Sequence, residues 1–244
     1  MIQVRNLRKS FGGDIVLRGV NLDVRDAETL VIIGDSGSGK SVLLKHLCGL
    51  MKPDSGQVIV DGTDIVTLSE EQLTPIRMKF GVEFQGTALF DSMTVFDNVA
   101  FPLRERLQLP EPEIEKRVDR ALAVMELLGA KDKKPAELSG GMQRRVALAR
   151  ACVPLPPYVV YDDPTAGLDP ILAKEICRYI LEMRNSYHTT NIVATYDMTC
   201  AASVADRIAM LHEGVTYAMG TPKQIWATSD PFVRKFVAGV ASLR

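Results

Sequence analysis

A glycine-rich segment with the sequence GDSGSGKS, residues 34–41, contains the residue types that bind a chain of phosphates. Its glycines allow the backbone to turn N–H groups inward around an anion, and a helix starting near Gly39 would add its partially positive end. Lys40 would then contact the β- and γ-phosphate oxygens, while the Ser41 hydroxyl would ligate Mg²⁺. The spacing predicts a nucleotide-binding loop but leaves open which nucleotide is bound and which reaction follows.

Two adjacent carboxylates, Asp162 and Asp163, follow the apolar run YVVY at residues 158–161. Paired carboxylates at the end of a strand are costly unless a cation lies beside them. Because a phosphate-binding loop is predicted elsewhere in the chain, the expected cation is Mg²⁺.

A second anion site is predicted at the segment SGGMQRR, which begins at Ser139. Ser139 can cap a helix that begins near Gly140. Two glycines directly after the cap weaken the start of a helix. If this segment were only a capped surface helix, there would be no reason for the two glycines. The pair favours close approach of an anion to the backbone at this helix terminus.

The elements that must position these residues follow from the apolar pattern. A strand at residues 29–33 runs directly into the phosphate-binding loop, and helical spacing resumes at Val42. Later in the chain, a strand at 158–161, a helix from 170 to about 184 and a strand at 191–195 follow one another. Strand, helix and strand in this order predict a parallel α/β core.

Two further regions are expected to flank this core. Residues 1–30 alternate apolar and polar side chains in short runs, which predicts an antiparallel sheet. Between residues 94 and 151 the pattern becomes helical, so we expect a helical subdomain inserted between two strands of the core. The remaining expected elements are strands at 57–60, 78–84, 207–211 and 215–219, two short helices within 222–243, and a helix opened by Pro112 and ended by Gly129, with Ile114, Val118, Ala121, Leu122, Met125 and Leu128 on its apolar face.

At 244 residues the chain is long enough for one large α/β domain but too short for two nucleotide-binding domains. We expect a core with its antiparallel subdomain at 1–93 and 152–221, a helical subdomain at 94–151 and a helical tail at 222–244. A formal net charge of -1 gives no general attraction to nucleic acid or to anionic lipid.

No apolar run approaches the ~18 to 20 residues that cross a bilayer, and the N-terminus lacks a secretory apolar region. The four cysteines, Cys48, Cys152, Cys177 and Cys200, lie in apolar contexts without metal-ligand spacing. These features predict a soluble protein with reduced, buried cysteines.

Together these segments resemble the ATP-binding subunit of ABC transporters over essentially the whole chain. Residues 34–41 resemble the Walker A loop, Gln85 the Q-loop glutamine, LSGGMQ at 138–143 the ABC signature, VVYDDP at 159–164 the Walker B motif and AGLD at 166–169 the D-loop. Phe11, which by itself would more often be a packing residue, resembles the aromatic residue that stacks on adenine. A phosphate-binding loop is shared by many NTPases, whereas the signature and D-loop in this order are highly specific.

The resemblance implies an ABC-type ATPase fold with a RecA-like core and a head-to-tail dimer that encloses two ATP molecules. It implies ATP contacts from Phe11, Val16, Gly34, Ser36, Gly37, Ser38, Gly39, Lys40, Ser41 and Val42, and from Ser139, Gly140, Gly141, Gln143 and Asp169 across the dimer interface. Mg²⁺ would be bound by Ser41, Gln85 and Asp162, and the catalytic residues would be Asp163, Tyr196, Gln85 and Lys40. The partners would be a second copy or another ABC ATPase, and a membrane permease docked near the Q-loop and the helical subdomain.

Residues 84–105 and the segment DPFVRKFVAG near the C-terminus resemble a narrower group, the Mla-type subfamily that energises phospholipid movement. This implies lipid transport from the cytoplasmic face of the inner membrane, with small accessory and periplasmic lipid-binding components. Importers of amino acids or ions share part of this pattern, so a small solute remains an alternative substrate.

Two residues depart from the common ABC pattern, which has glutamate at the position of Asp163 and histidine at the position of Tyr196. Asp163 is one methylene shorter, so its carboxylate would lie roughly 1.3 to 1.5 Å further from the attacking water, and misplacement by about 1 Å can cost ~10²-fold in rate. Tyr196 keeps an O–H donor but cannot become a cation near neutral pH. Three explanations stay open: a working but slow ATPase, the degenerate half of an asymmetric dimer, or an ATP-gated clamp without turnover.

Overall fold

The computed structural model describes residues 1–84 and 86–241. This part of the chain forms two compact units, of which unit 1 comprises Met1–Lys79 and the segment from Thr190 onward, and unit 2 comprises Phe80–Thr189. The three-part division expected from the sequence stays a prediction.

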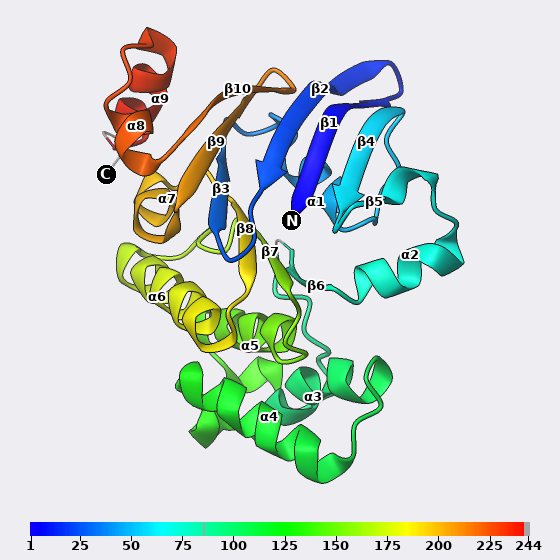
Figure 1. The fold of residues 1–244 in the computed structure, drawn as a ribbon. Helices are drawn as coiled ribbons and strands as arrows, with labels where there is room; N and C mark the ends of the chain where they lie inside the picture. The colour runs from blue at the N-terminus through cyan, green and yellow to red at the C-terminus, as the bar shows by residue number, and fades with distance from the viewer. Residues whose placement is uncertain (85, 242–244) are drawn as a thin grey trace. The chain divides into compact units, whose positions relative to one another are not determined.

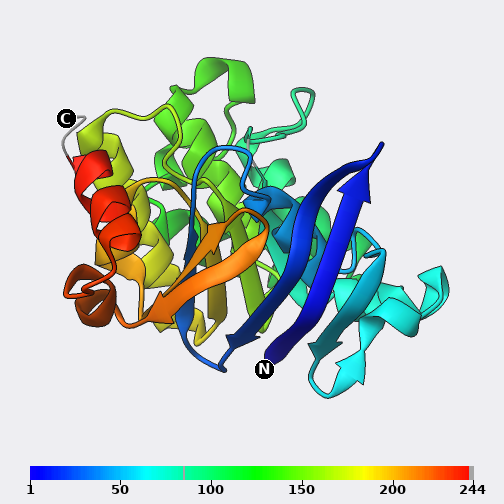
Figure 2. The same ribbon diagram turned by 90° about the horizontal axis from the view of Figure 1, so that it is seen from above.

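Unit 1 combines an antiparallel sheet, in the order β2-β1-β4-β5, with a group of parallel strands in which β3 lies between β8 and β9. Figures 1 and 2 show β1, β2 and β4 side by side. Its elements are β1 (Ile2–Phe11), β2 (Asp14–Val24), β3 (Thr29–Ile33), α1 (Lys40–Leu47), β4 (Ser55–Val60), β5 (Thr63–Asp64), a 3₁₀ turn (Ile65–Thr67), α2 (Glu70–Arg77), β8 (Thr190–Ala194), α7 (Met198–Val204), β9 (Arg207–His212), β10 (Val215–Gly220), α8 (Pro222–Trp226) and α9 (Pro231–Ala241).

The two sheets follow from two different sequence patterns. In β1 and β2 the buried side chains are largely separated by exposed or half-buried ones, because one face of this sheet is covered. Every residue of β3 and β8 is buried, as the continuous apolar runs predict for parallel strands covered on both faces. The expected antiparallel sheet at residues 1–30 and the α/β class are confirmed.

Unit 2 contains two parallel strands and four longer helices. Its elements are β6 (Phe80–Glu83), α3 (Val95–Glu105), α4 (Glu111–Val124), 3₁₀ turns (Leu128–Ala130 and Pro135–Glu137), α5 (Gly140–Cys152), β7 (Tyr158–Asp162) and α6 (Pro170–Tyr187). Helices α3, α4 and α6 all contact α5, which is therefore the central helix of this unit.

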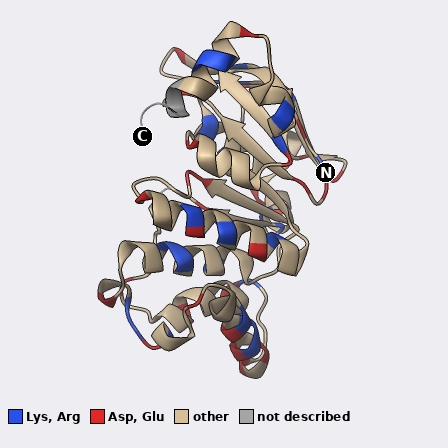
Figure 3. Cartoon of the chain, turned by 90° about the vertical axis from the view of Figure 1, so that its left-hand side faces the viewer, with Lys and Arg blue, Asp and Glu red and all other residues tan. Residues whose placement is uncertain are grey.

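Helix α4 confirms the predicted apolar face with one exception. Ile114, Val118, Ala121 and Leu122 are buried, as is Met125 directly after the helix. Leu128 was assigned to this face, but the helix ends at Val124 and the Leu128 side chain is 50% exposed. The exposed positions of α4 include acidic and basic residues, and Figure 3 shows how such residues are distributed over the ribbon.

Helix α2 was not predicted, although the sequence contains its start signal. The Ser69 hydroxyl accepts from the backbone N–H of Gln72, and the Gln72 side chain accepts from the backbone N–H of Ser69. This reciprocal arrangement is a capping box, which fixes the first turn of a helix. The predicted strand at 78–84 is correspondingly shorter, because Met78 ends α2 and β6 spans only Phe80–Glu83.

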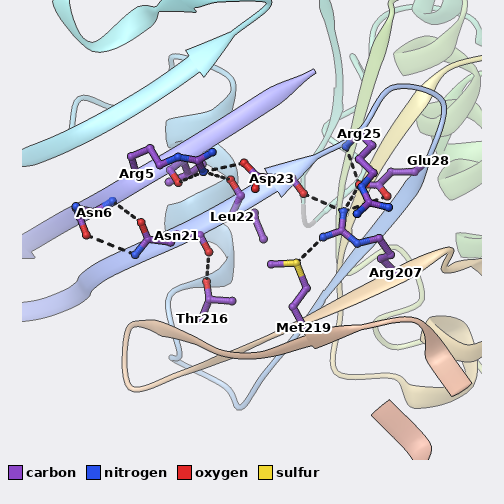
Figure 4. Close-up of polar contacts among 11 residues, drawn as sticks. Arg5, Asn6, Asn21, Leu22, Asp23, Arg25, Glu28, Arg207, Thr216 and Met219 are labelled. Atoms are coloured by element: carbon purple, nitrogen blue, oxygen red, sulfur yellow. Dashed lines mark hydrogen bonds and ion pairs between the residues drawn. The ribbon is translucent and has the colours of Figure 1, made fainter. Parts of the chain in front are cut away.

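A buried ion pair connects strands of unit 1 (Figure 4). Glu28 accepts from the Arg207 guanidinium at 2.9 Å and from the backbone N–H of Arg25 at 2.7 Å. The other guanidinium nitrogen of Arg207 contacts the Met219 sulfur at 2.6 Å. The Glu28–Arg207 pair thereby ties the start of β3 to β9 and β10.

All four cysteines are buried, and none of them forms a disulfide within the described residues, as expected. Among the described residues, no helix is both long enough and apolar enough to span a membrane.

Candidate functional site

The glycine-rich loop lies between β3 and α1, and its fold requires glycine at two positions. A Cβ atom on Gly34 would lie 2.3 Å from the carbonyl oxygen of Leu211. A Cβ on Gly39 would lie 2.8 Å from a methyl group of Leu17, and Gly39 also has a φ of +99°. The loop is therefore pressed against β2 on one side and the end of β9 on the other.

The outer part of the same loop is open. Gly37 has a φ of +78°, yet a Cβ there would meet no atom within 4 Å. Ser36 is exposed, whereas the Ser38 hydroxyl is buried without a hydrogen-bond partner among the described residues. An open turn with an orphaned hydroxyl fits a loop that closes around an anion.

Lys40 and Ser41 begin α1, whose N-cap Gly39 supplies no side-chain cap. The Lys40 ammonium donates to the carbonyl oxygens of Gly34 at 2.7 Å and Asp35 at 2.9 Å, so it lies over the loop. The helix presents its partially positive end in the same place. The lysine, the open turn and the helix terminus lie together at one loop, and phosphate binding there stays a prediction.

Phe11 and Val16 belong to the hairpin of β1 and β2 in unit 1. Val16 lies beside the loop, since a Cβ on Gly39 would be 3.1 Å from one of its methyl groups. Phe11 ends β1 with a 44% exposed ring, and the Lys9 ammonium lies 5.4 Å from the centre of that ring. An exposed aromatic ring at the end of a strand can stack on a base, and a packing role for Phe11 inside the unit is disfavoured.

Tyr196 follows β8, and the fold of unit 1 brings its segment to the loop. The Thr195 N–H donates to the Ile32 carbonyl at 3.0 Å, two residues before Gly34. The Tyr196 side chain is 51% exposed. The next residue, Asp197, caps α7 by accepting from the N–H groups of Thr199 and Cys200. The Tyr196 side chain is therefore largely open to solvent, while the residues before and after it, Thr195 and Asp197, are held by hydrogen bonds.

In unit 2, Asp162 is the last residue of β7, and its side chain is buried. Asp163 follows in a left-handed conformation with a φ of 55°, which aspartate tolerates better than most residues. The Asp163 carbonyl accepts from the Ala166 N–H at 3.1 Å, which closes a turn. The two adjacent carboxylates thus differ in environment, one inside the strand end and one at a tight corner.

The signature segment starts α5 as predicted. The Ser139 hydroxyl accepts from the Met142 N–H at 3.3 Å, and the Gln143 side chain donates to the Pro135 carbonyl at 2.9 Å. A Cβ atom on Gly140 would meet no atom within 4 Å, whereas a Cβ on Gly141 would lie 3.3 Å from Leu172 of α6. Close backbone approach thus explains Gly141 within this unit, and Gly140 is available to an outside group.

Asp169 caps α6, accepting from the N–H groups of Ile171 at 2.9 Å and Leu172 at 3.1 Å. Its carboxylate therefore has a structural role whatever else it contacts. Gln85, predicted as a catalytic and metal-binding residue, lies outside the described residues.

Unit 2 also contains two arginines on α5 that sequence reasoning did not assign. Arg144 donates to the Glu83 carboxylate at 3.0 Å, and Arg150 donates to the carbonyls of Thr87 and Ala88, each at 2.9 Å. Burial raises the pKa of Glu83 to about 7, although the Arg144 charge opposes this shift. The only sequence signal was an acidic residue inside an otherwise apolar strand.

A hollow of about 250 Å³ opens beside Arg150 in unit 2. Its lining includes Phe90, Phe101, Pro102 and Arg106. The Phe90 and Phe101 rings lie 4.7 Å apart, and the Arg150 guanidinium lies 5.6 Å from the Phe90 ring. An aromatic surface with arginines beside it suits contact with another protein.

Comparison with known proteins agrees with this geometry. A family model described as ABC transporter matches residues 17–166. The chain is 41% identical over 239 residues to the "Probable ribonucleotide transport ATP-binding protein mkl" of Mycobacterium leprae, covering 98% of this chain and 69% of that protein. It is 38% identical over 239 residues to the "Intermembrane phospholipid transport system ATP-binding protein MlaF" of Haemophilus influenzae, covering 98% of this chain and 90% of that protein.

Solved structures show the same fold. The ATP-binding cassette MJ0796, in a dimeric post-hydrolysis state bound to ADP and Pi, matches with a TM-score of 0.81 and 34% identity, over 91% of this chain and 98% of that one. The cbiO1 protein of Clostridium perfringens, part of an ABC transporter complex, matches with a TM-score of 0.86 and 32% identity, over 99% of this chain and 96% of that one. The chain therefore belongs to the ABC transporter family, as an ATP-binding, ATP-hydrolysing subunit.

Proposed function

We propose that this ABC subunit hydrolyses ATP to energise the movement of phospholipid through a separate membrane permease. The observation that carries the lipid assignment is the identity of 38% to the phospholipid transport protein of Haemophilus influenzae along 90% of its length. A ribonucleotide substrate is the competing interpretation, because the mycobacterial relative with that name is 41% identical. Phospholipid is preferred because residues 84–105 and the segment DPFVRKFVAG resemble the Mla-type subfamily.

Within the subunit, the loop at residues 34–41 holds the phosphates of ATP. Its backbone N–H groups and the α1 terminus neutralise part of their charge, and Lys40 turns from the loop carbonyls to the phosphate oxygens. Gly34, Ser36, Gly37, Ser38, Gly39 and Val42 form the cradle, with Val16 beside it and Phe11 stacked on the adenine.

Mg²⁺ is proposed as the metal, because the Ser41 hydroxyl and the Asp162 carboxylate are hard oxygen ligands of the kind it prefers. Gln85 is proposed as a third ligand from its sequence position. When bound, Mg²⁺ offsets the charge that develops on the transferred phosphoryl group.

Asp163 is proposed as the general base that takes a proton from the attacking water, and Tyr196 as a donor to the γ-phosphate. A positioned base contributes about 10² to 10⁴-fold in rate. Because position 163 still carries a carboxylate, we favour a working enzyme. The family relationship gives no support to a degenerate site or to a clamp without turnover. Slow turnover stays a prediction from the short side chain of Asp163.

The proposed assembly is a dimer in which Ser139, Gly140, Gly141, Gln143 and Asp169 of one subunit complete the site of the other. Open Gly140 supports this role, since its backbone is accessible. The hollow beside Arg150 is proposed as the contact with the permease, and the subunit would then lie at the cytoplasmic face of the inner membrane. Small accessory and periplasmic lipid-binding components are proposed as further partners.

The transport proposal can be tested with the subunit purified together with its membrane partners and placed in lipid vesicles. We expect ATP-dependent transfer of a fluorescent phospholipid with wild-type protein and none with Lys40→Ala. Labelled ribonucleotide and labelled amino acid are the parallel substrates. Transfer of either of these, with no phospholipid transfer, would refute the lipid assignment while leaving the ATPase assignment intact.

A further inference from the structure

The Glu83 carboxylate lies at the junction of three segments of unit 2. It is on β6, two positions before Gln85 in the chain, and its side chain is 1% exposed. It accepts from the Arg144 guanidinium at 3.0 Å, and Arg144 lies on α5, the helix that starts with the signature segment. The other guanidinium nitrogen of Arg144 donates to the Ala166 carbonyl at 3.2 Å.

Ala166 connects this ion pair to the proposed base. The Ala166 N–H donates to the Asp163 carbonyl at 3.1 Å, so both backbone polar groups of Ala166 are held by hydrogen bonds. The contacts therefore run without interruption from Glu83 through Arg144 and Ala166 to Asp163.

Stability does not explain this arrangement. The second oxygen of Glu83 is buried without a hydrogen-bond partner among the described residues, which carries a desolvation cost. Replacing a buried ion pair by apolar residues of similar volume is often neutral or even stabilising. A buried pair of this kind is more useful for fixing one geometry than for adding free energy of folding.

We propose that Glu83 is a positioning residue for ATP hydrolysis, which holds Arg144 so that the Ala166 carbonyl and the Asp163 corner stay in one arrangement. The inference rests on the proposed function, in which Asp163 is the base. The backbone position of residue 163 matters more with aspartate than with glutamate. The shorter aspartate side chain has less conformational freedom to bring its carboxylate to the water if the backbone is displaced.

The informative variant is the double replacement Glu83→Leu with Arg144→Met, compared with Glu83→Gln. We expect the double variant to melt at or above the temperature of the wild type while kcat falls by about 10- to 100-fold. The KM for ATP should stay within about twofold, since no proposed ATP contact is changed. Glu83→Gln should lower kcat to a similar degree and also lower the melting temperature.

The matched control is Glu28→Gln, which breaks the other buried Glu–Arg pair of the chain's described part, in unit 1 (Figure 4). It should lower the melting temperature and leave kcat unchanged when turnover is measured well below that temperature. A second readout, hydrogen–deuterium exchange of the amides at residues 163–169, needs no turnover. Exchange there should accelerate in both Glu83 variants and not selectively in Glu28→Gln.

Unchanged kcat and unchanged exchange at 163–169 in the double variant would overturn the proposal. If wild-type protein itself shows no turnover, the proposed ATPase function fails. In that case the exchange measurement alone decides whether Glu83 holds the loop, so the two failures are distinguishable.

Discussion

At the scale of single residues, Asp163 combines a short carboxylate with an unusual backbone. Its φ of 55° lies in the left-handed region, which aspartate adopts more readily than most other residues. The residue is held there by the bond from the Ala166 N–H to its carbonyl. Position 163 therefore has aspartate in place of the usual glutamate and also has a left-handed backbone conformation that aspartate tolerates well.

Asp163→Asn keeps the shape of the side chain but removes the proposed base, so kcat should fall by about 10² to 10⁴-fold. The affinity for ATP, measured by equilibrium titration, should change little because the phosphate loop is intact. Tyr196→Phe, which removes a donor rather than the base, is the companion variant. Wild-type turnover by Asp163→Asn would show that the base is another group.

At the scale of elements, two helices with a serine N-cap differ in their proposed roles. Ser69 caps α2 and Ser139 caps α5, and each hydroxyl accepts from the backbone N–H three residues later at 3.3 Å. Neither position is buried. Both serines cap a helix, Ser69 as part of a capping box, and only Ser139 is proposed to contact ATP.

We expect Ser69→Ala and Ser139→Ala each to lower the free energy of unfolding by about 1 kcal/mol, as lost caps usually do. Only Ser139→Ala should also lower ATP turnover. Urea denaturation and a turnover assay on the same preparations check both parts. Equal loss of turnover in the two variants would mean that Ser139 acts through stability alone.

Asp54, directly before β4, makes a pH-dependent contact with Lys9 and Ser10 of β1. Hydrogen bonds from Ser10 and then from Lys9 lower the pKa of Asp54 to about 2, from an ordinary value of 3.8. The folded state therefore favours the ionised carboxylate. This contribution is fully present above the ordinary pKa and is lost as the pH falls through the folded value.

The variant Asp54→Asn has no ionisable carboxylate at this position. The wild type should have the higher melting temperature at pH 6, and the difference should shrink as the pH is lowered from about 4 toward about 2. Thermal melts at a series of pH values and constant ionic strength measure this difference in melting temperature. A difference that stays constant over this range would show that the ionised form of Asp54 is not what stabilises the strand pair.

At the scale of the whole molecule, each proposed ATP site needs residues from two copies. The loop at 34–41 belongs to unit 1, whereas the signature start at Ser139 belongs to unit 2 of a second subunit in the proposed dimer. Association should therefore depend on bound ATP. The similar cassette MJ0796 was solved as a dimer bound to ADP and Pi.

We expect Asp163→Asn to form a stable dimer when ATP and Mg²⁺ are present, because binding continues while turnover is blocked. Lys40→Ala should stay monomeric under the same conditions, since it weakens phosphate binding. Analytical ultracentrifugation with and without ATP distinguishes the two. A dimer of equal stability without nucleotide would contradict ATP-dependent association.

The local parts of this protein could be predicted from its amino-acid sequence. The turn between β3 and α1, the Ser139 cap and most strands were predicted correctly because short-range rules govern them: glycine at strained corners, hydroxyls at helix starts and continuous apolar runs in buried strands. Even α2, which was missed, has its Ser69 capping box as a local signal. The motifs also identified the family, since their order along the chain needs no tertiary information.

Contacts between distant residues could be learned only from the folded chain. Glu83 and Arg144 are 61 positions apart, and no local pattern names one as the partner of the other. The same holds for Glu28 with Arg207 and for the carbonyl of Leu211 that excludes a side chain at Gly34. Burial and hydrogen bonding across such separations depend on how strands and helices pack, which the spacing of residues in the chain does not encode.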